Sequence, residues 1–197
     1  MGRGVLDLER HFAFYGAYHS NPINIIIHVL FVWPIFYTSL VLFHFTPSLI
    51  QLPPLPFLSP PLLLNFGFFF ALLYASFYVL LDRRAGSLAA LLCLFCWLSS
   101  SSLASRLGFS LAWKVVLAAQ LFCWIGQFIG HGVFEKRAPA LLDNLSQALL
   151  MAPFFVLLEV LQNFCGYEPY PGFRASVEAK IDAEIKEWQA KKQKKTS

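Results

Sequence analysis

Two histidines near the start of a long apolar stretch could do chemistry. His19 lies just before that stretch, and His28 lies inside it, four residues after Asn24. Residues four apart stack on one face of a helix, so a helix here presents Asn24 and His28 together. Ionisable side chains in such stretches are costly and by default mark a functional site.

A second polar group stands at the end of a later apolar stretch. Gln127, His131 and Glu135 recur every four residues, which predicts one stripe along a helix. Gly130 and Gly132 flank this stripe, and small residues let another helix approach closely. If the two groups meet, three imidazoles and a carboxylate converge.

Such a convergence predicts a metal site. Neutral imidazole is the commonest ligand for iron, zinc and copper. Three nitrogen ligands with open positions suit non-haem Fe(II) and oxygen chemistry, although zinc fits almost as well on sequence alone. Two other hypotheses stay open. One is a membrane haem protein with His28 and His131 as axial ligands, and the other is a non-enzymatic membrane organiser whose polar side chains only hydrogen-bond helices together.

The composition shows what kind of protein must position these residues. Of 197 residues, 57% are hydrophobic and 13% are charged, about half the charged fraction of soluble domains. Between residues 11 and 81 there is no Asp, Glu, Lys or Arg. Because something must face water, soluble, disordered and nucleic-acid-binding proteins are excluded despite the net charge of +4. The sequence predicts an integral membrane protein.

Continuous apolar runs predict an all-α, polytopic membrane helical bundle. A spanning helix needs about 20 mostly apolar residues, and a proline-rich segment (46–61) and a serine-rich segment (99–110) separate some of the runs. The last run contains Pro153 and Glu159, which suits a re-entrant or interfacial segment better than a full span. We therefore expect four spans and a re-entrant or fifth hydrophobic segment: 23–43, 62–81, 87–104, 115–134 and 145–164.

The basic residues predict the orientation. Cytosolic loops carry an excess of Lys and Arg, and these residues gather before the first run, after the second and fourth, and at the end of the chain. The N-terminus and the C-terminus are therefore expected in the cytosol. The first run then begins, and the fourth ends, on the cytosolic side, which brings the two polar groups to one depth. His44 lies beyond His28 by about 24 Å along the helix and cannot join them.

Residues 172–197 differ from the single membrane-embedded catalytic domain that we expect over residues 1–171. An apolar stripe in a charged sequence predicts an amphipathic helix that could lie on lipid headgroups. Lys194 and Lys195 precede the last two residues, which resembles the dilysine retrieval signal of the endoplasmic reticulum. A basic tail attracted to anionic lipid is the alternative. The stripe consists of Val177, Ile181, Ile185 and Trp188.

At the two polar groups the sequence resembles the Mpo1-like family. One matching string covers residues 14–24 together with His28, and the other covers residues 124–141 and continues to Glu159. The resemblance extends over roughly residues 5 to 171. It implies an Fe(II)-dependent dioxygenase of the endoplasmic reticulum membrane that shortens long-chain 2-hydroxy fatty acids by one carbon. Such enzymes act in fatty acid α-oxidation and in the breakdown of phytosphingosine.

The resemblance also implies roles for the polar residues. Glu135 or Asn24 would be a fourth ligand or would orient a ligand, and Gln127 could hydrogen-bond bound oxygen or the substrate carboxylate. Three histidines would bind the iron: His19, His28 and His131.

The partners implied by the family are a long-chain 2-hydroxy fatty acid, O2 and membrane lipid, with no nucleic acid. A 2-hydroxy acid can chelate Fe(II) through its hydroxyl and carboxylate, while its tail lies between the spans. Each buried methylene contributes about 0.8 kcal/mol. The tail would therefore supply binding affinity, and the metal would fix the position of the acid group. The chain length of the substrate, a co-substrate and the oligomeric state stay open.

Overall fold

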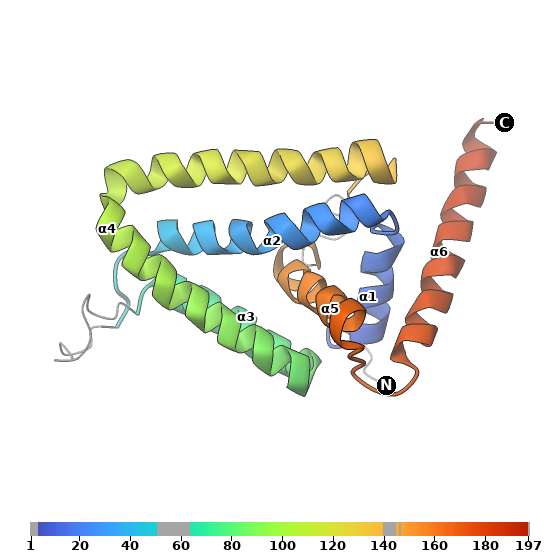
Figure 1. Cartoon of the computed structure of the whole chain (residues 1–197), viewed down its shortest axis with the longest axis horizontal. Coiled ribbons are helices and arrows are strands. Elements are labelled where there is room, and N and C mark those ends of the chain that lie inside the picture. The colour runs from blue at the N-terminus through green and yellow to red at the C-terminus, as the bar shows by residue number, and fades with distance from the viewer. Residues whose placement is uncertain (1–3, 51–63, 140–144, 146, 197) are drawn as a thin grey trace. The chain divides into compact units, whose positions relative to one another are not determined.

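The structure, a computed structural model, describes residues 4–50, 64–139, 145 and 147–196 (Figure 1). These residues form helices and, apart from one isolated bridge, no strand, which confirms the all-α prediction. Two of the helices, η1 and η3, are π-helices. In chain order the helices are α1 (Leu8–Ala17), α2 (Pro22–Phe43), α3 (Phe66–Leu81), α4 (Arg83–Ile129), η1 (Gly130–Glu135), η3 (Gln147–Met151), α5 (Ala152–Cys165) and α6 (Phe173–Thr196).

Three helical segments are long and apolar enough to cross a membrane: Pro22–Phe43, Arg83–Glu135 and Ala148–Cys165. α3 is also apolar but shorter, with 16 residues. Many large apolar side chains lie exposed on these helices, which suits contact with lipid chains rather than with water. The protein is therefore a membrane protein, and the number of crossings stays a prediction.

The serine-rich segment, predicted as a connector, is helical except at Gly108, where two helices meet at a kink. The prediction of a break between the two runs is therefore confirmed, but the break is one residue rather than a loop. α4 continues through it, and the chain departs from helical geometry at Gly108, where φ is 67° and ψ is 161°. The serine hydroxyls bond inside the helix, as when Ser99 Oγ donates to the carbonyl of Phe95 at 2.7 Å and Ser105 Oγ to that of Ser101 at 2.9 Å. Because a serine hydroxyl can find a partner one turn back, serine does not break an apolar helix. Glycine does, because it adopts a positive φ without strain.

The chain folds as two compact units, residues 30–126 and residues 1–29 with 127–197. In the first unit, Gln120 of α4 binds α2, because its Nε2 donates to the Ile35 carbonyl at 3.0 Å and to the Thr38 hydroxyl at 2.9 Å. Such amide hydrogen bonds hold helices together in lipid. Every candidate site residue belongs to the second unit, which we call the histidine unit. The predicted domain boundary at residue 171 stays a prediction.

Aromatic rings of α1, α5 and α6 form the core of the histidine unit. The ring centroid of Phe12 lies 5.5 Å from that of Phe155 and 5.9 Å from that of Phe173. The predicted C-terminal helix is confirmed as α6, which packs along α1 (Figure 1). Ile181 of its apolar stripe occupies the space beside Gly16, where a Cβ atom would collide with it. This part of the stripe therefore packs on protein rather than on lipid headgroups.

Glu9 of α1 links that helix to α6. Its side chain is 9% exposed and accepts hydrogen bonds from the Tyr170 and Ser176 hydroxyls and from Lys180 Nζ, the last at 2.5 Å. These donors, Lys180 most of all, lower the pKa of Glu9 from 4.5 to about 2. The contact is therefore a charged one at neutral pH.

The Glu9 contact predicts a loss of stability in acid. Because the folded-state pKa of Glu9 is depressed, the contact stabilises fully above about pH 4.5, and this contribution is lost as the pH falls through about 2. Replacing Glu9 by Gln should lower the free energy of unfolding near pH 6 by about 1.5–3 kcal/mol and remove this part of the acid dependence. Thermal unfolding in lipid nanodiscs between pH 6 and pH 2.5 measures both effects.

A matched control is Glu178→Gln, which removes an exposed carboxylate of α6 that pairs with Arg174. Exposed pairs contribute little, so this variant should follow the wild-type curve. Parallel curves for the wild type and Glu9→Gln over the whole range would contradict the proposed linkage.

Candidate metal centre

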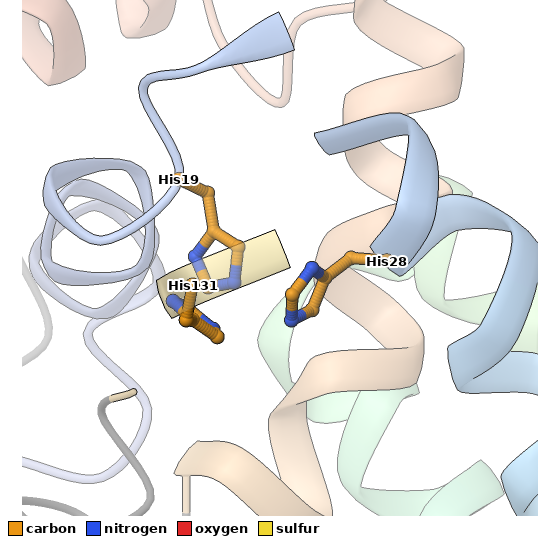
Figure 2. Close-up of side chains that lie close together, drawn as sticks. All are labelled: His19, His28 and His131. Carbon is orange, nitrogen blue, oxygen red and sulfur yellow. The ribbon is translucent and has the colours of Figure 1, made fainter. Parts of the chain in front are cut away.

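Three imidazoles from separate segments meet inside the histidine unit. His19 follows α1, His28 lies in the second turn of α2, and His131 lies in η1. One nitrogen of each ring lies within 4.8 Å of the corresponding nitrogen of the other two, and Figure 2 shows the three rings turned toward one another. The ring centroids are 4.3 to 4.9 Å apart. The predicted meeting of the first and fourth apolar runs at these residues is confirmed.

Backbone carbonyls fix two of the rings. His19 Nδ1 lies 2.8 Å from the carbonyl oxygen of Tyr15, and His28 Nδ1 lies 2.9 Å from that of Asn24. Since a carbonyl only accepts, both Nδ1 atoms carry the proton and both Nε2 atoms keep a lone pair. Metal-bound histidines are oriented in this way, with the second ring nitrogen donating to a carbonyl.

His131 reaches the cluster from a π-helix. α4 ends at Ile129, and the chain continues as η1 over Gly130–Glu135. The sequence predicted a regular helix through Glu135, whereas the structure has the wider turn of a π-helix there. π-turns of this kind are frequent at functional sites. Gly130 is needed here, because a Cβ atom on it would collide with Asn24 Oδ1. Gly130 thus lets the start of α2 approach η1 closely, whereas Gly132 has open space where a Cβ atom would stand.

Glu135 is bound to the start of α2 rather than to the imidazoles. Its Oε1 accepts from the backbone N–H and the hydroxyl of Ser20 at 3.1 and 2.5 Å, and its Oε2 accepts from Asn21 N at 3.0 Å and Asn24 Nδ2 at 3.1 Å. A carboxylate at a helix N-terminus is favourable because the helix dipole and the free N–H groups stabilise it. Of the two roles implied for Glu135, this geometry favours positioning over metal binding.

The two predicted amide residues occupy different environments. The Asn24 side chain is fully buried, and its Nδ2 donates to Glu135 and, at 3.3 Å, to the Tyr18 carbonyl. Its own carbonyl holds His28, so Asn24 connects the carboxylate to the imidazole. Gln127 is buried in the last turn of α4, four residues before His131, and its role stays a prediction.

Arg137 has a positioning role that the sequence did not reveal. Its Nη1 donates to the Ala17 carbonyl at 2.7 Å, and its guanidinium stacks on the Tyr18 ring at 3.6 Å and faces the Trp188 ring at 5.1 Å. Arg137 thereby joins the end of η1 to the end of α1 and to α6. In the sequence it follows Glu135 and Lys136 at the end of an apolar run, where it is indistinguishable from the basic residues that flank any span.

Tyr15 is the other neighbour that sequence reasoning missed. Its ring stacks on His19 with centroids 4.1 Å apart and planes 18° apart, and burial raises the pKa of its hydroxyl well above the ordinary value. The spacing of four residues between Tyr15 and His19 in a helical run was the available signal. Burial, followed by the charges of His28 and His131, holds the pKa of His19 well below its ordinary value. The His19 imidazole is therefore neutral at pH 7, the form that binds metals.

These side chains fit a transition metal. Among the described residues, the group that could bind one consists of the three buried histidines and contains no carboxylate or thiol. His19 Nε2 and His131 Nδ1 are buried and have no hydrogen-bond partner. Unpaired buried nitrogens cost free energy, and a cation bound by the lone pairs would remove that cost.

The same geometry disfavours a haem between His28 and His131. Axial ligands stand on opposite faces of a macrocycle, which fills the plane between them. The His19 nitrogen lies within 4.8 Å of the nitrogens of both residues, so it occupies the space that the macrocycle would need.

Comparisons with known proteins find a matching family and a similar enzyme. The family model described as "2-hydroxy-palmitic acid dioxygenase Mpo1-like" matches residues 5–164, which include all three histidines. The 2-hydroxy-palmitic acid dioxygenase MPO1 of Saccharomyces cerevisiae is 36% identical over 187 residues, which are 95% of each chain. No solved structure matches.

Proposed function

The chain belongs to the Mpo1-like family, and on that premise we propose that it is an Fe(II)-dependent dioxygenase of 2-hydroxy fatty acids. The observation that carries the proposal is the cluster of three buried imidazoles with their nitrogens within 4.8 Å of one another. Iron is preferred to zinc because zinc has no redox chemistry, whereas a dioxygenase must activate O2. When bound, Fe(II) would supply the electron-transfer chemistry with O2 that the side chains lack.

The reaction breaks the bond between the carboxyl carbon and C2 of the substrate. One 2-hydroxy acid and one O2 give a fatty acid shorter by one carbon, one CO2 and one water, so atoms and electrons balance. C2 is oxidised to the new carboxyl group, and O2 is reduced. The reaction is a step of fatty acid α-oxidation, and phytosphingosine breakdown would supply such substrates.

The protein contributes orientation and an apolar surface. The carbonyls of Tyr15 and Asn24 hold two imidazoles with their lone pairs free, and Glu135 fixes the loop that carries His19. Large apolar side chains on the same unit lie exposed around the segments that carry the histidines, and they suit an acyl chain or lipid: Ile23, Ile26, Phe128, Ile129 and Val133.

The site of action that we propose is the endoplasmic reticulum membrane, with both chain ends in the cytosol. Its support is the distribution of basic residues along the apolar runs and the pair Lys194 and Lys195 near the end of the chain. Replacing both lysines by serine should release the protein from the endoplasmic reticulum if the pair is a retrieval signal, and should leave its location unchanged if the pair only attracts anionic lipid.

The test of the activity uses the full chain in nanodiscs, loaded anaerobically with Fe(II). Addition of 2-hydroxyhexadecanoate and O2 should yield pentadecanoate and CO2 in equal amounts. The zinc-loaded protein and the metal-free protein should yield neither, and hexadecanoate should not react. A protein that binds iron stoichiometrically and gives no shortened acid would contradict the proposal.

A further inference from the structure

The Tyr15 hydroxyl is a buried polar group that the fold does not use. The residue is 6% exposed, and within the described part of the chain its hydroxyl has no hydrogen-bond partner. Its ring packs against Phe12 and Phe155, contacts that a phenylalanine would make equally well. Burying an unpaired hydroxyl lowers stability, so packing alone does not account for a tyrosine at this position.

The Tyr15 ring belongs to the surroundings of the three histidines. The Tyr15 ring stacks on His19 at 4.1 Å, and the His19 ring lies 4.3 Å from His28 and 4.9 Å from His131. Tyr15 and His19 are also joined through the backbone, since the Tyr15 carbonyl holds His19 Nδ1. A ligand that binds at the imidazoles therefore lies beside a histidine whose ring is stacked on the Tyr15 ring.

Other donors around the centre are already paired. His19 Nδ1 and His28 Nδ1 donate to carbonyls, and Asn24 Nδ2 donates to Glu135 and to Tyr18. Of the imidazole nitrogens that do not donate to these carbonyls, one on each of the three rings would bind the metal. Among the described groups at the centre, two donors then remain for an oxygen atom of a ligand: the Tyr15 hydroxyl, whose ring stacks on His19, and the amide of Gln127, four residues before His131.

We propose that the Tyr15 hydroxyl donates a hydrogen bond to the carboxylate of the bound 2-hydroxy fatty acid. This inference rests on the proposed function. Tyrosine is protonated at neutral pH, so it donates to a carboxylate and cannot compete with it for the metal unless it ionises. The hydrogen bond would recognise the acid group of the substrate and hold it in one orientation beside the imidazoles.

The experiment compares binding without turnover. Wild type and Tyr15→Phe, loaded with iron and kept anaerobic in nanodiscs, are titrated with 2-hydroxyhexadecanoate and with 1,2-hexadecanediol, which keeps the hydroxyl but lacks the carboxylate. The substitution should weaken binding of the acid about 10- to 100-fold and change binding of the diol less than about twofold. Metal content should be unchanged, and thermal stability should be unchanged or higher.

Tyr170→Phe is the matched control, because its hydroxyl has a partner in Glu9. This variant should lose thermal stability and bind the acid like the wild type, the opposite of Tyr15→Phe. Unchanged affinity for the acid in Tyr15→Phe would overturn the inference, and so would loss of bound iron, which would make the phenol a ligand. A wild-type protein that binds iron but does not prefer the acid to the diol would overturn the proposed function as well.

Discussion

Replacing His28 or His131 by alanine is expected to lower metal affinity at least about 100-fold and to abolish turnover. Each residue supplies one of three nitrogens that lie within 4.8 Å of one another, and two imidazoles do not complete the site. Loss of a metal ligand should exceed the 10- to 100-fold loss that is typical when a group behind a ligand is removed. Metal content after dialysis and the yield of shortened acid measure the two effects.

His44→Ala is the matched control. His44 follows α2 in the other unit, where its Nε2 lies 3.2 Å from the Ser105 hydroxyl, and it is not part of the metal-binding group. This variant should keep both metal and turnover. Turnover retained in His28→Ala or His131→Ala would remove that residue from the proposed ligand set.

The same variants separate the enzyme from the membrane organiser. If the histidines only hydrogen-bond helices together, the wild type should bind no metal. Replacing a histidine should then lower the stability of the protein and leave its metal content unchanged. The structure argues against that role, because His19 Nε2 and His131 Nδ1 lie buried without partners in the described part of the chain. Side chains that join helices would use these atoms.

Helices with a clear apolar run could be predicted from the sequence, and their ends and partners could not. The start of α2 follows from Pro22, which suits the first turn of a helix. The serine run of α4 correctly indicated a break between two runs, which lies at Gly108. It did not indicate the helix that continues up to this break, in which the Ser99 and Ser105 hydroxyls bond to carbonyls one turn back. The apolar stripe on α6 could be predicted, but what covers it could not, because periodicity does not distinguish lipid from protein. In the structure Ile181 of this stripe packs on Gly16 of α1.

At the site, residue types could be predicted but not the groups that hold them. Histidines in apolar runs are rare enough to identify, and the orientation of the runs was sufficient to bring them together. The partners of Glu135 were out of reach, because they include backbone N–H groups of Ser20 and Asn21, more than a hundred positions earlier. The π-helix could not be predicted either, because the four-residue spacing of His131 and Glu135 indicates a regular helix. The wider turn of the π-helix moves Glu135 off the stripe that contains His131.

Glu135→Gln is expected to weaken metal binding about 10- to 100-fold and to lower the free energy of unfolding by about 3 kcal/mol. Both carboxylate oxygens accept hydrogen bonds, from Ser20 on one side and from Asn21 and Asn24 on the other. A glutamine keeps one accepting oxygen and turns an NH2 group toward donors on the other side. The loop that carries His19 should then lose its fixed position. So should the side chain of Asn24, the residue whose backbone carbonyl holds His28.

A positioning role and a ligand role for Glu135 give different responses to excess iron. If Glu135 positions the histidines, saturating Fe(II) should restore full metal content and most of the turnover in Glu135→Gln, because the three nitrogens are still present. If Glu135 is a ligand, turnover should stay low in the iron-saturated variant, since one coordinating oxygen has gone. Glu178→Gln removes an exposed carboxylate of α6 and should match the wild type in metal content, stability and turnover. Because four donors already surround the Glu135 carboxylate, we expect recovery at high iron, and a permanently inactive, metal-saturated variant would restore the carboxylate to the ligand set.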